Sequence, residues 1–200
     1  MAYSMERHNT DSDGIVNGRR EHMRGYDSII KKAHNFSLRR PAVFFDRDGT
    51  LNEDRGYPHK TEDLVLIPGA AKAVHNFNER GYFTIIVTNQ SGIARSYFGK
   101  EDLKRFNAAL RHDLLLERAK IDLILYCPHH PDFSGPCACR KPQPGMIHAA
   151  TRLLPINLNT SLLIGDQPSD LLCATAAGIK GYLFKGGNLY DFCTQQNLFK

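Results

Sequence analysis

Two hundred residues, 42% of them hydrophobic and 24% charged, suit one globular domain rather than a membrane protein or a disordered chain. The net charge of +5 is diffuse and is not interleaved with aromatic residues in one stripe, which argues against a nucleic-acid-binding surface. No apolar run is long enough to cross a bilayer, and the N-terminus has no apolar signal segment, so a cytoplasmic location is expected.

The first forty residues differ in character from the rest of the chain. They carry eight Lys or Arg and five Asp or Glu, without a sustained hydrophobic period. This composition predicts a poorly ordered N-terminal extension over residues 1–40. Residues 41–200 alternate apolar runs with amphipathic stretches and are expected to form a single domain.

Five short apolar runs predict buried parallel strands, because they are rich in aliphatic and aromatic residues and are bounded by turn residues. They lie at residues 41–45, 83–87, 123–126, 162–164 and 181–184. Apolar residues at helical spacing predict helices at residues 70–80, 101–119, 145–154 and 169–177. Strands that alternate with helices indicate a doubly wound, parallel α/β sheet with right-handed crossovers.

Polar side chains follow three of these strands. Asp46 and Asp48 follow the first strand, Thr88 and Asn89 the second, and Asp166 the fourth. Residues i and i+2 that leave a strand point the same way, and ligands bind beyond the carboxyl ends of parallel strands. These side chains are therefore expected in one crevice. Paired carboxylates repel each other unless a cation or a proton lies between them, so the pattern predicts a divalent metal site.

The stretch Asp46-Arg47-Asp48-Gly49 has two other interpretations. A calcium-binding loop is excluded, because its glycine and glutamate positions would fall on Leu51 and Tyr57. An ordinary turn stays open for this stretch alone. The motifs farther along the chain favour the metal site.

These residue types fit phosphoryl transfer. Asp46, Asp48 and Asp166 supply carboxylate oxygens for Mg²⁺, which prefers a phosphate among its remaining ligands. Thr88 offers a neutral donor, and Lys141 offers a positive charge for phosphate oxygens. A carboxylate is also a competent nucleophile toward phosphorus. No Walker-type or dinucleotide-binding glycine motif is present, so nucleotide-driven chemistry lacks a phosphate cradle.

Four motifs together resemble the phosphatases of the haloacid dehalogenase (HAD) superfamily: residues 46–50, residues 88–92, the region of Lys141, and Gly165-Asp166 followed by Asp170. Within the superfamily, residues 41–185 are most similar to the heptose 1,7-bisphosphate 7-phosphatase family, on segments 54–57, 88–95, 127–131 and 139–142. The resemblance implies an enzyme of ADP- or GDP-heptose biosynthesis, and thus of lipopolysaccharide core synthesis, with a sugar phosphate as substrate.

The resemblance also implies a division of labour between the paired aspartates. Asp46 is the expected nucleophile and a magnesium ligand. Asp48 is expected to protonate the leaving sugar oxygen and then to activate water, with its backbone carbonyl facing the metal.

Other roles carried over from the family concern phosphate, metal and substrate. Thr88 and Lys141 are expected to stabilise the phosphoryl group, Asp166 to complete the magnesium site, and Asp170 to support that site without contacting the metal. The expected substrate-binding residues are Asp54, Arg55, Gly56, Tyr57, Asn89, Gln90, Ser91 and Arg140.

A compact group of cysteines and histidines predicts a second metal site. Cys127, His129, Cys137 and Cys139 offer a Cys₃His set of the kind that binds structural zinc, although His130 could replace His129 and the clustering could be chance. The resemblance implies zinc with His129 as ligand, in a loop that stands in place of a large cap domain. Cys173 and Cys193 are expected to be ordinary core or surface residues.

Three rival functions stay open at the level of sequence. Histidinol-phosphatase shares the zinc loop, and polynucleotide 3′-phosphatase shares the Asp-x-Asp-Gly-Thr motif. A zinc-loop protein that binds nucleic acid or a partner without catalysis would fit the pI near 9.0. The small cap and the absence of a long apolar stripe favour a monomer.

Overall fold

The computed structural model describes residues 39–199. The extension predicted for residues 1–40 thus lies outside the described residues except for Arg39 and Arg40. Arg40 joins the domain, because its backbone N–H donates to Pro155 O at 3.0 Å and its guanidinium carbon lies 3.9 Å from the centre of the Phe83 ring. Backbone hydrogen bonding to the domain therefore begins at Arg40, one residue before the expected start of the domain.

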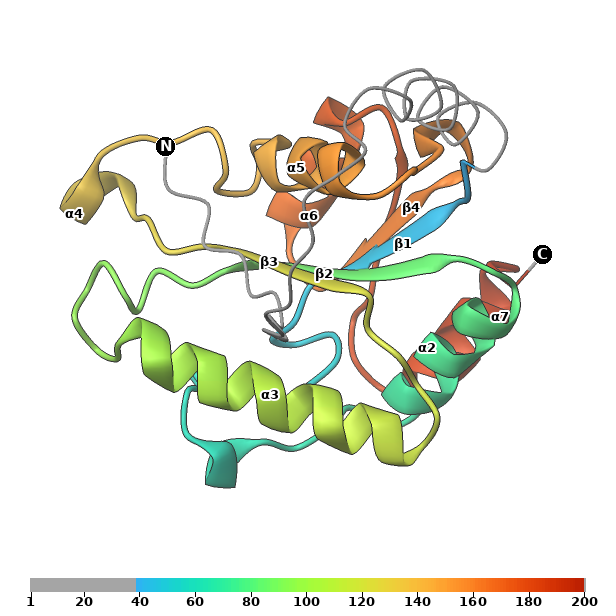
Figure 1. Ribbon diagram of the computed structural model, residues 1–200, viewed down its shortest axis with the longest axis horizontal. Coiled ribbons are helices and arrows are strands. Elements are labelled where there is room, and N and C mark those ends of the chain that lie inside the picture. Colours follow the sequence, from blue (N-terminus) through green and yellow to red (C-terminus); the bar gives the residue numbers. More distant parts are fainter. Residues whose placement is uncertain (1–38, 200) are drawn as a thin grey trace, which may run out of the picture.

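Five parallel strands form one sheet, which confirms the predicted fold class (Figure 1). The strands are β1 (Ala42–Phe45), β2 (Phe83–Asn89), β3 (Leu123–Cys127), β4 (Leu162–Gly165) and β5 (Lys180–Leu183). Their order across the sheet is β3-β2-β1-β4-β5, so β1 lies at the centre, with β2 and β4 on either side. All three of these strands end at the same edge, where the predicted polar side chains follow them.

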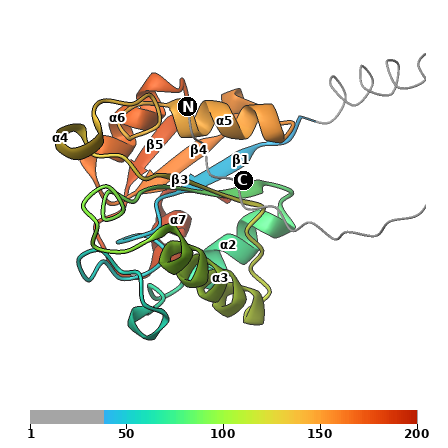
Figure 2. The same cartoon turned by 60° about the vertical axis from the view of Figure 1, so that its left-hand side comes forward.

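Helices cover both faces of the sheet, as expected for a doubly wound fold (Figure 2). On one face α2 (Ala70–Glu79), α3 (Lys100–Leu116) and α7 (Leu189–Gln195) pack against alternate strand residues such as Phe45 and Ile86. On the other face α5 (Gly145–Leu153) and α6 (Pro168–Ala176) pack against the intervening strand residues, such as Phe44 and Ile85. Burial on both faces explains why the strands read as continuous apolar runs.

Several elements were not predicted or have different bounds. The helix α7 lies where no helix was predicted, and it buries Cys193 in the core. The strand β2 runs two residues beyond its predicted end, which places Thr88 and Asn89 within the strand itself. The helix α3 ends at Leu116, three residues earlier than expected. Cys173 is also buried, so both remaining cysteines are core residues.

The loop between β1 and α2 and the loop between β3 and α5 contain little regular structure. The first holds the 3₁₀ turn η1 (Thr61–Asp63) and the second the single-turn α4 (Pro131–Ser134), and a further 3₁₀ turn, η2 (Leu158–Thr160), precedes β4. Within residues 39–199 the fold therefore has two small loops where a large cap would stand. Among the same residues, no helix combines the length and apolar character needed to cross a membrane.

Candidate active site

One cavity opens beyond the carboxyl ends of β1, β2 and β4. Its volume is about 460 Å³, and its lining comes from the strand ends, the loop after β1, the end of the cysteine loop and the start of α6. The lining residues are Asp46, Asp48, Asp54, Gly56, Tyr57, Thr88, Asn89, Gln90, Arg140, Lys141, Asp166, Gln167 and Ser169. The topology thus gathers most of the predicted site residues around one space.

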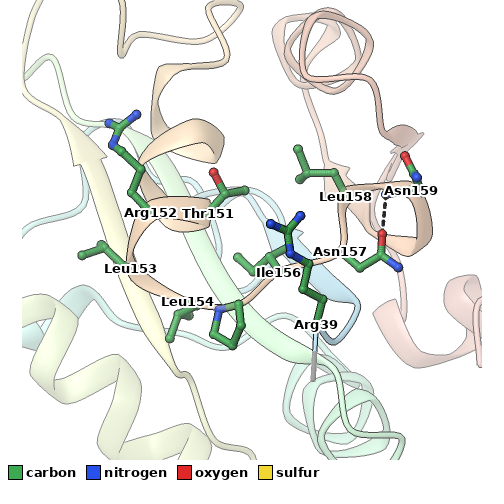
Figure 3. A pocket seen from close by; sticks show the side chains of 10 residues that line it. Arg39, Thr151, Arg152, Leu153, Leu154, Ile156, Asn157, Leu158 and Asn159 are labelled. Carbon is green, nitrogen blue, oxygen red and sulfur yellow. Dashed lines mark hydrogen bonds between the residues drawn. The ribbon is translucent and has the colours of Figure 1, made fainter. Parts of the chain in front are cut away.

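A second cavity, of about 600 Å³, lies near the amino ends of the strands and is lined by residues around the end of α5 and η2 (Figure 3). Arg39 and Arg152 are the charged residues of its lining, and the other side chains there are apolar, hydroxyl or amide groups. None of the described residues that line it is Asp, Glu, His or Cys, so it lacks groups for metal or acid–base chemistry. The cavity at the carboxyl ends is the candidate active site.

Lys141 joins two aspartates at the floor of the active-site cavity. Its ammonium nitrogen lies 2.9 Å from Asp46 Oδ1 and 2.6 Å from Asp170 Oδ1, and it donates to Val87 O at 2.9 Å. Burial raises the pKa of Asp46 to about 7 even though Lys141 opposes this shift. Burial alone would lower the pKa of Lys141, but Asp46 and Asp170 outweigh it and raise that pKa. The lysine is therefore a fixed positive charge beside the expected nucleophile.

Three carboxylates form a group that could hold a cation. Oxygen atoms of Asp46, Asp166 and Asp170 lie within 4.8 Å of one another. Asp166 Oδ1 is buried without a hydrogen-bond partner among the described residues, and burial raises the pKa of Asp166. Only a glycine at position 49 allows the Asp166 carboxylate to lie here, because a Cβ at Gly49 would stand 2.6 Å from Asp166 Cγ. An all-oxygen set with an unpaired buried oxygen fits a hard divalent cation such as Mg²⁺.

Asp48 lies beside this group rather than in it. Its Oδ1 accepts hydrogen bonds from Arg47 Nε and Asn52 Nδ2, each at 2.9 Å. Its Oδ2 accepts from Gln90 Nε2 at 2.8 Å, and the same amide nitrogen lies 2.9 Å from Thr88 Oγ1. The carboxylate thus faces the cavity with its orientation fixed, which suits proton transfer more than metal binding through the side chain.

The predicted zinc ligands also come together. Sγ and Nδ1 atoms of Cys127, His129, Cys137 and Cys139 lie within 4.8 Å of one another. Contact with the Cys127 thiol lowers the pKa of Cys139 to about 5, so this sulfur is readily ionised for a metal. His130, the alternative ligand, points elsewhere, with Nε2 at 2.9 Å from Arg95 Nη2. The geometry therefore favours a closed Cys₃His site with His129.

The chain was compared with known proteins. It is 39% identical over 162 residues to the D-glycero-beta-D-manno-heptose-1,7-bisphosphate 7-phosphatase of Rhodopseudomonas palustris, covering 78% of this chain and 90% of the relative. It is 44% identical over 144 residues to the enzyme of the same name from Photorhabdus laumondii, covering 70% of this chain and 77% of that one.

Such identity over nearly the whole length of a relative decides the family. The chain belongs to the D-glycero-beta-D-manno-heptose-1,7-bisphosphate 7-phosphatase family. The HAD-hydrolase-like family also matches residues 138–191. Among solved structures, the D,D-heptose 1,7-bisphosphate phosphatase of B. bronchiseptica, crystallised with magnesium and phosphate, superposes with a TM-score of 0.69 at 30% identity, covering 78% of this chain and 87% of that one.

Membership of the heptose-bisphosphate phosphatase family confirms the resemblance seen in the motifs and identifies an enzyme. It disfavours the non-catalytic zinc-loop protein, whose support was the pI and the cysteine cluster alone.

Several of the expected substrate-binding residues line the cavity, and others do not. Asp54, Gly56, Tyr57 and Arg140 belong to its lining. Arg55 does not, because its guanidinium is exposed and paired with Glu53 at 2.8 Å, and buried Ser91 is not part of the lining either.

Asn89 and Gln90 line the cavity but hold protein groups. The amide of Asn89 forms two hydrogen bonds with the backbone of Lys141, donating to O at 3.1 Å and accepting from N at 3.0 Å. Gln90 contacts Asp48 and Thr88. These amides therefore fix the positions of Lys141, Asp48 and Thr88 at the cavity.

Sequence reasoning missed two lining residues, Gln167 and Ser169. Gln167 Nε2 donates to Asp166 Oδ2 at 2.6 Å, which leaves Oδ1 of Asp166 for a metal. The only signal for both was their position directly after Gly165-Asp166, at the start of α6.

Proposed function

We propose that this protein hydrolyses the 7-phosphate of D-glycero-β-D-manno-heptose 1,7-bisphosphate through an aspartyl-phosphate on Asp46, as a step of ADP- or GDP-heptose biosynthesis. The observation that carries the proposal is the convergence of Asp46, Lys141 and Asp166 in one cavity with Asp48 alongside. The substrate and its β anomer follow the names of the relatives from R. palustris and P. laumondii.

The first half of the reaction is transfer of the phosphoryl group to the enzyme. Asp46 Oδ attacks phosphorus, the bond between phosphorus and the sugar O7 breaks, and Asp48 gives a proton to O7. Lys141 and Thr88 stabilise negative charge on the phosphoryl oxygens. Mg²⁺, held by Asp46, Asp166 and the backbone carbonyl of Asp48, would neutralise charge on the transferring group.

The second half releases phosphate. A water molecule attacks phosphorus of the aspartyl-phosphate, and Asp48 now accepts the proton of that water. The bond between phosphorus and Asp46 Oδ breaks, which restores the carboxylate and releases inorganic phosphate. Because Asp48 donates one proton and accepts one, the cycle balances without a further reactant.

Arg140 is the candidate for the distal phosphate at C1. It lines the cavity beside Lys141, and its Nη1 donates to His129 O at 3.2 Å, so the loop of the four zinc ligands fixes its position. A planar guanidinium suits a phosphate through paired hydrogen bonds. We infer that zinc bound by Cys127, His129, Cys137 and Cys139 serves the reaction by holding this loop.

The test is magnesium-dependent phosphate release from heptose 1,7-bisphosphate, with ³¹P NMR to identify which phosphate leaves. Wild type is expected to release the 7-phosphate and Asp46→Asn to release none. Asp113→Asn on the exposed side of α3 is the matched control and should retain full activity. Release of the 1-phosphate would contradict the proposal.

Histidinol phosphate is the rival substrate. The segments at residues 54–57 and 91–95 favour the heptose ester, since they match that branch of the superfamily. Side-by-side kcat/KM values on the two substrates decide between them, and higher turnover of histidinol phosphate would refute the choice.

The enzyme is also proposed to act as a cytoplasmic monomer. Among the described residues the exposed large apolar side chains form small, separate groups, so none of the helices offers a broad apolar face: Leu115 and Leu116 at the end of α3, Phe133 on α4, Leu172 on α6, and the paired rings of Tyr57 and Tyr97 on loops. Sedimentation equilibrium tests this, and a dimer at micromolar concentration would overturn it.

A further inference from the structure

Arg47 stands between the two catalytic aspartates, yet the proposed mechanism gives its side chain no task. Its side chain is fully buried, with 0% exposure. A whole buried ion pair can often be replaced by apolar residues without loss of stability, so stability alone does not explain why an arginine stands here. The contacts of the Arg47 side chain indicate what it does.

The guanidinium of Arg47 holds Asp48 with two parallel hydrogen bonds. Nε donates to Oδ1 and Nη2 to Oδ2, each at 2.9 Å. Nη2 also donates to Pro58 O at 3.0 Å. This two-point contact fixes both the position and the plane of the carboxylate, because the fork of the arginine matches the two oxygens.

The helix α3 holds the other side of the guanidinium. Nη1 donates to Asn107 Oδ1 at 3.0 Å, and the guanidinium carbon lies 4.5 Å from the centre of the Phe106 ring. Asn107 is a buried amide on a helix face that is otherwise apolar, with Leu103 and Leu110 near it. The contact joins residues 60 positions apart in the sequence.

We propose that Arg47 and Asn107 are positioning residues that set the carboxylate of Asp48 for proton transfer to the leaving sugar oxygen. The inference rests on the proposed function, in which Asp48 is the acid. Asn107 is not among the residues that line the cavity, so it acts through Arg47 alone. Loss of either residue should slow the step that needs the acid and spare the steps that do not.

Two phosphate esters separate these steps. When phosphorus is transferred from the heptose ester, the leaving group is a sugar alkoxide that must be protonated, whereas the leaving group of 4-nitrophenyl phosphate is a stabilised phenolate. The value of kcat/KM reports phosphoryl transfer to Asp46 for both. We expect Arg47→Met to lower kcat/KM about 100-fold for the sugar ester and less than about 10-fold for the aryl ester, because misplacing a catalytic group by an ångström costs about that much.

Asn107→Leu is the second variant, chosen because its side chain touches neither Asp48 nor the cavity lining. The same selective loss is expected, smaller than that of Arg47→Met. Asn107→Asp keeps an acceptor for Nη1 and should restore most of the sugar-ester activity. Arg111→Met is the matched control, since Arg111 lies on the same helix, donates to Ile121 O at 2.8 Å and is not part of the cavity lining.

An equal decrease in kcat/KM for the two esters would overturn the inference. Arg47 would then stabilise the fold or position Asp46, and not Asp48. Unchanged kcat/KM in Arg47→Met would overturn it as well. If Arg47→Met does not fold by circular dichroism, Asn107→Leu decides the matter in the same way.

Failure of the proposed function is a separate outcome. If the wild-type protein does not hydrolyse heptose bisphosphate but hydrolyses another sugar phosphate, the proposed function is refuted. The kcat/KM values of the variants are then compared for this other sugar ester and the aryl ester. A wild-type protein that hydrolyses no phosphate ester would overturn both.

Discussion

Lys141 and Asp170 form a buried ion pair, with 2.6 Å between the ammonium nitrogen and Oδ1 and side-chain exposures of 1% and 0%. The second oxygen of Asp170 accepts a hydrogen bond from the backbone N–H of Gln167 at 3.0 Å, at the start of α6. One carboxylate thus joins the first turn of a helix to the lysine beside Asp46. A single residue links the stability of α6 to the geometry of the active site.

Breaking this pair should cost both stability and activity. We predict that Asp170→Asn lowers the free energy of unfolding by about 3 kcal/mol, because the buried ammonium of Lys141 loses one of its two carboxylate partners. The value of kcat should fall about 10-fold to 100-fold, as Lys141 and the metal-binding carboxylates lose their support. Urea denaturation and phosphate release measure the two effects.

Asp102→Asn is the control for this change, because Asp102 forms an exposed ion pair with Arg105 on α3. Such a pair is worth at most about 1 kcal/mol. Wild-type stability in Asp170→Asn would show that Lys141 does not depend on its partner.

The raised pKa of Asp46 predicts a pH dependence of stability in the metal-free protein. Burial raises this pKa to about 7 from 3.8, so between these values the folded protein binds more protons than the unfolded chain. Stability from this group is therefore greatest at low pH and falls as the pH rises from about 4 to 7, by up to about 4 kcal/mol. Mg²⁺ competes with the proton, so its stabilising effect should grow over the same interval.

The measurement is the difference in unfolding free energy between wild type and Asp46→Asn as a function of pH, in EDTA. The asparagine variant lacks the titrating group, so the difference isolates it. A difference that stays constant between pH 4 and pH 7 would show that Asp46 titrates normally.

Zinc binding is expected to depend on Cys137 and not on Cys173. Cys137 Sγ lies 3.5 Å from Cys127 Sγ and 3.4 Å from Cys139 Sγ, whereas burial raises the pKa of Cys173 to about 11 and keeps it a thiol. Metal analysis should find one zinc per chain in wild type and in Cys173→Ala, and less than half of that in Cys137→Ala. Full zinc content in Cys137→Ala would refute the site.

Arg140 is expected to recognise the distal phosphate. Arg140→Ala should lower kcat/KM for heptose 1,7-bisphosphate about 10-fold to 100-fold, because a hydrogen bond to a charged group contributes about 1.5–3 kcal/mol. The same change should alter kcat/KM for heptose 7-phosphate, which lacks the second phosphate, by less than about 3-fold.

Arg55→Ala is the matched control for Arg140→Ala. Arg55 is exposed, pairs with Glu53 and does not line the cavity, so its loss should leave both substrates within about 3-fold of wild type. Equal losses of Arg140→Ala on the two substrates would place the arginine elsewhere than at the distal phosphate.

The part of the site that could be predicted from the sequence consists of polar residues that directly follow apolar strand segments. Asp46, Thr88 and Asp166 could be placed together because each follows an apolar run, and parallel strands end at one edge. Spacing alone could not choose between His129 and His130, because the choice depends on where each ring points after the strand ends.

Contacts between residues far apart in the chain could not be predicted from the sequence. The bond between Arg47 and Asn107 depends on how α3 packs on the sheet, and its only trace was a polar residue on an apolar helical face. The helix α7 was missed because it has only about two turns, its hydrophobic pattern is weak, and it packs against α2, which the sequence alone does not show.

The central claim is covalent transfer of the phosphoryl group to Asp46, and rapid acid quenching during turnover tests it most directly. Peptide mass spectrometry of the quenched enzyme should find a phosphoryl group on Asp46 that disappears once substrate is exhausted. Phosphate release with no phosphorylated peptide at any time, or a phosphoryl group on another residue, would contradict the account.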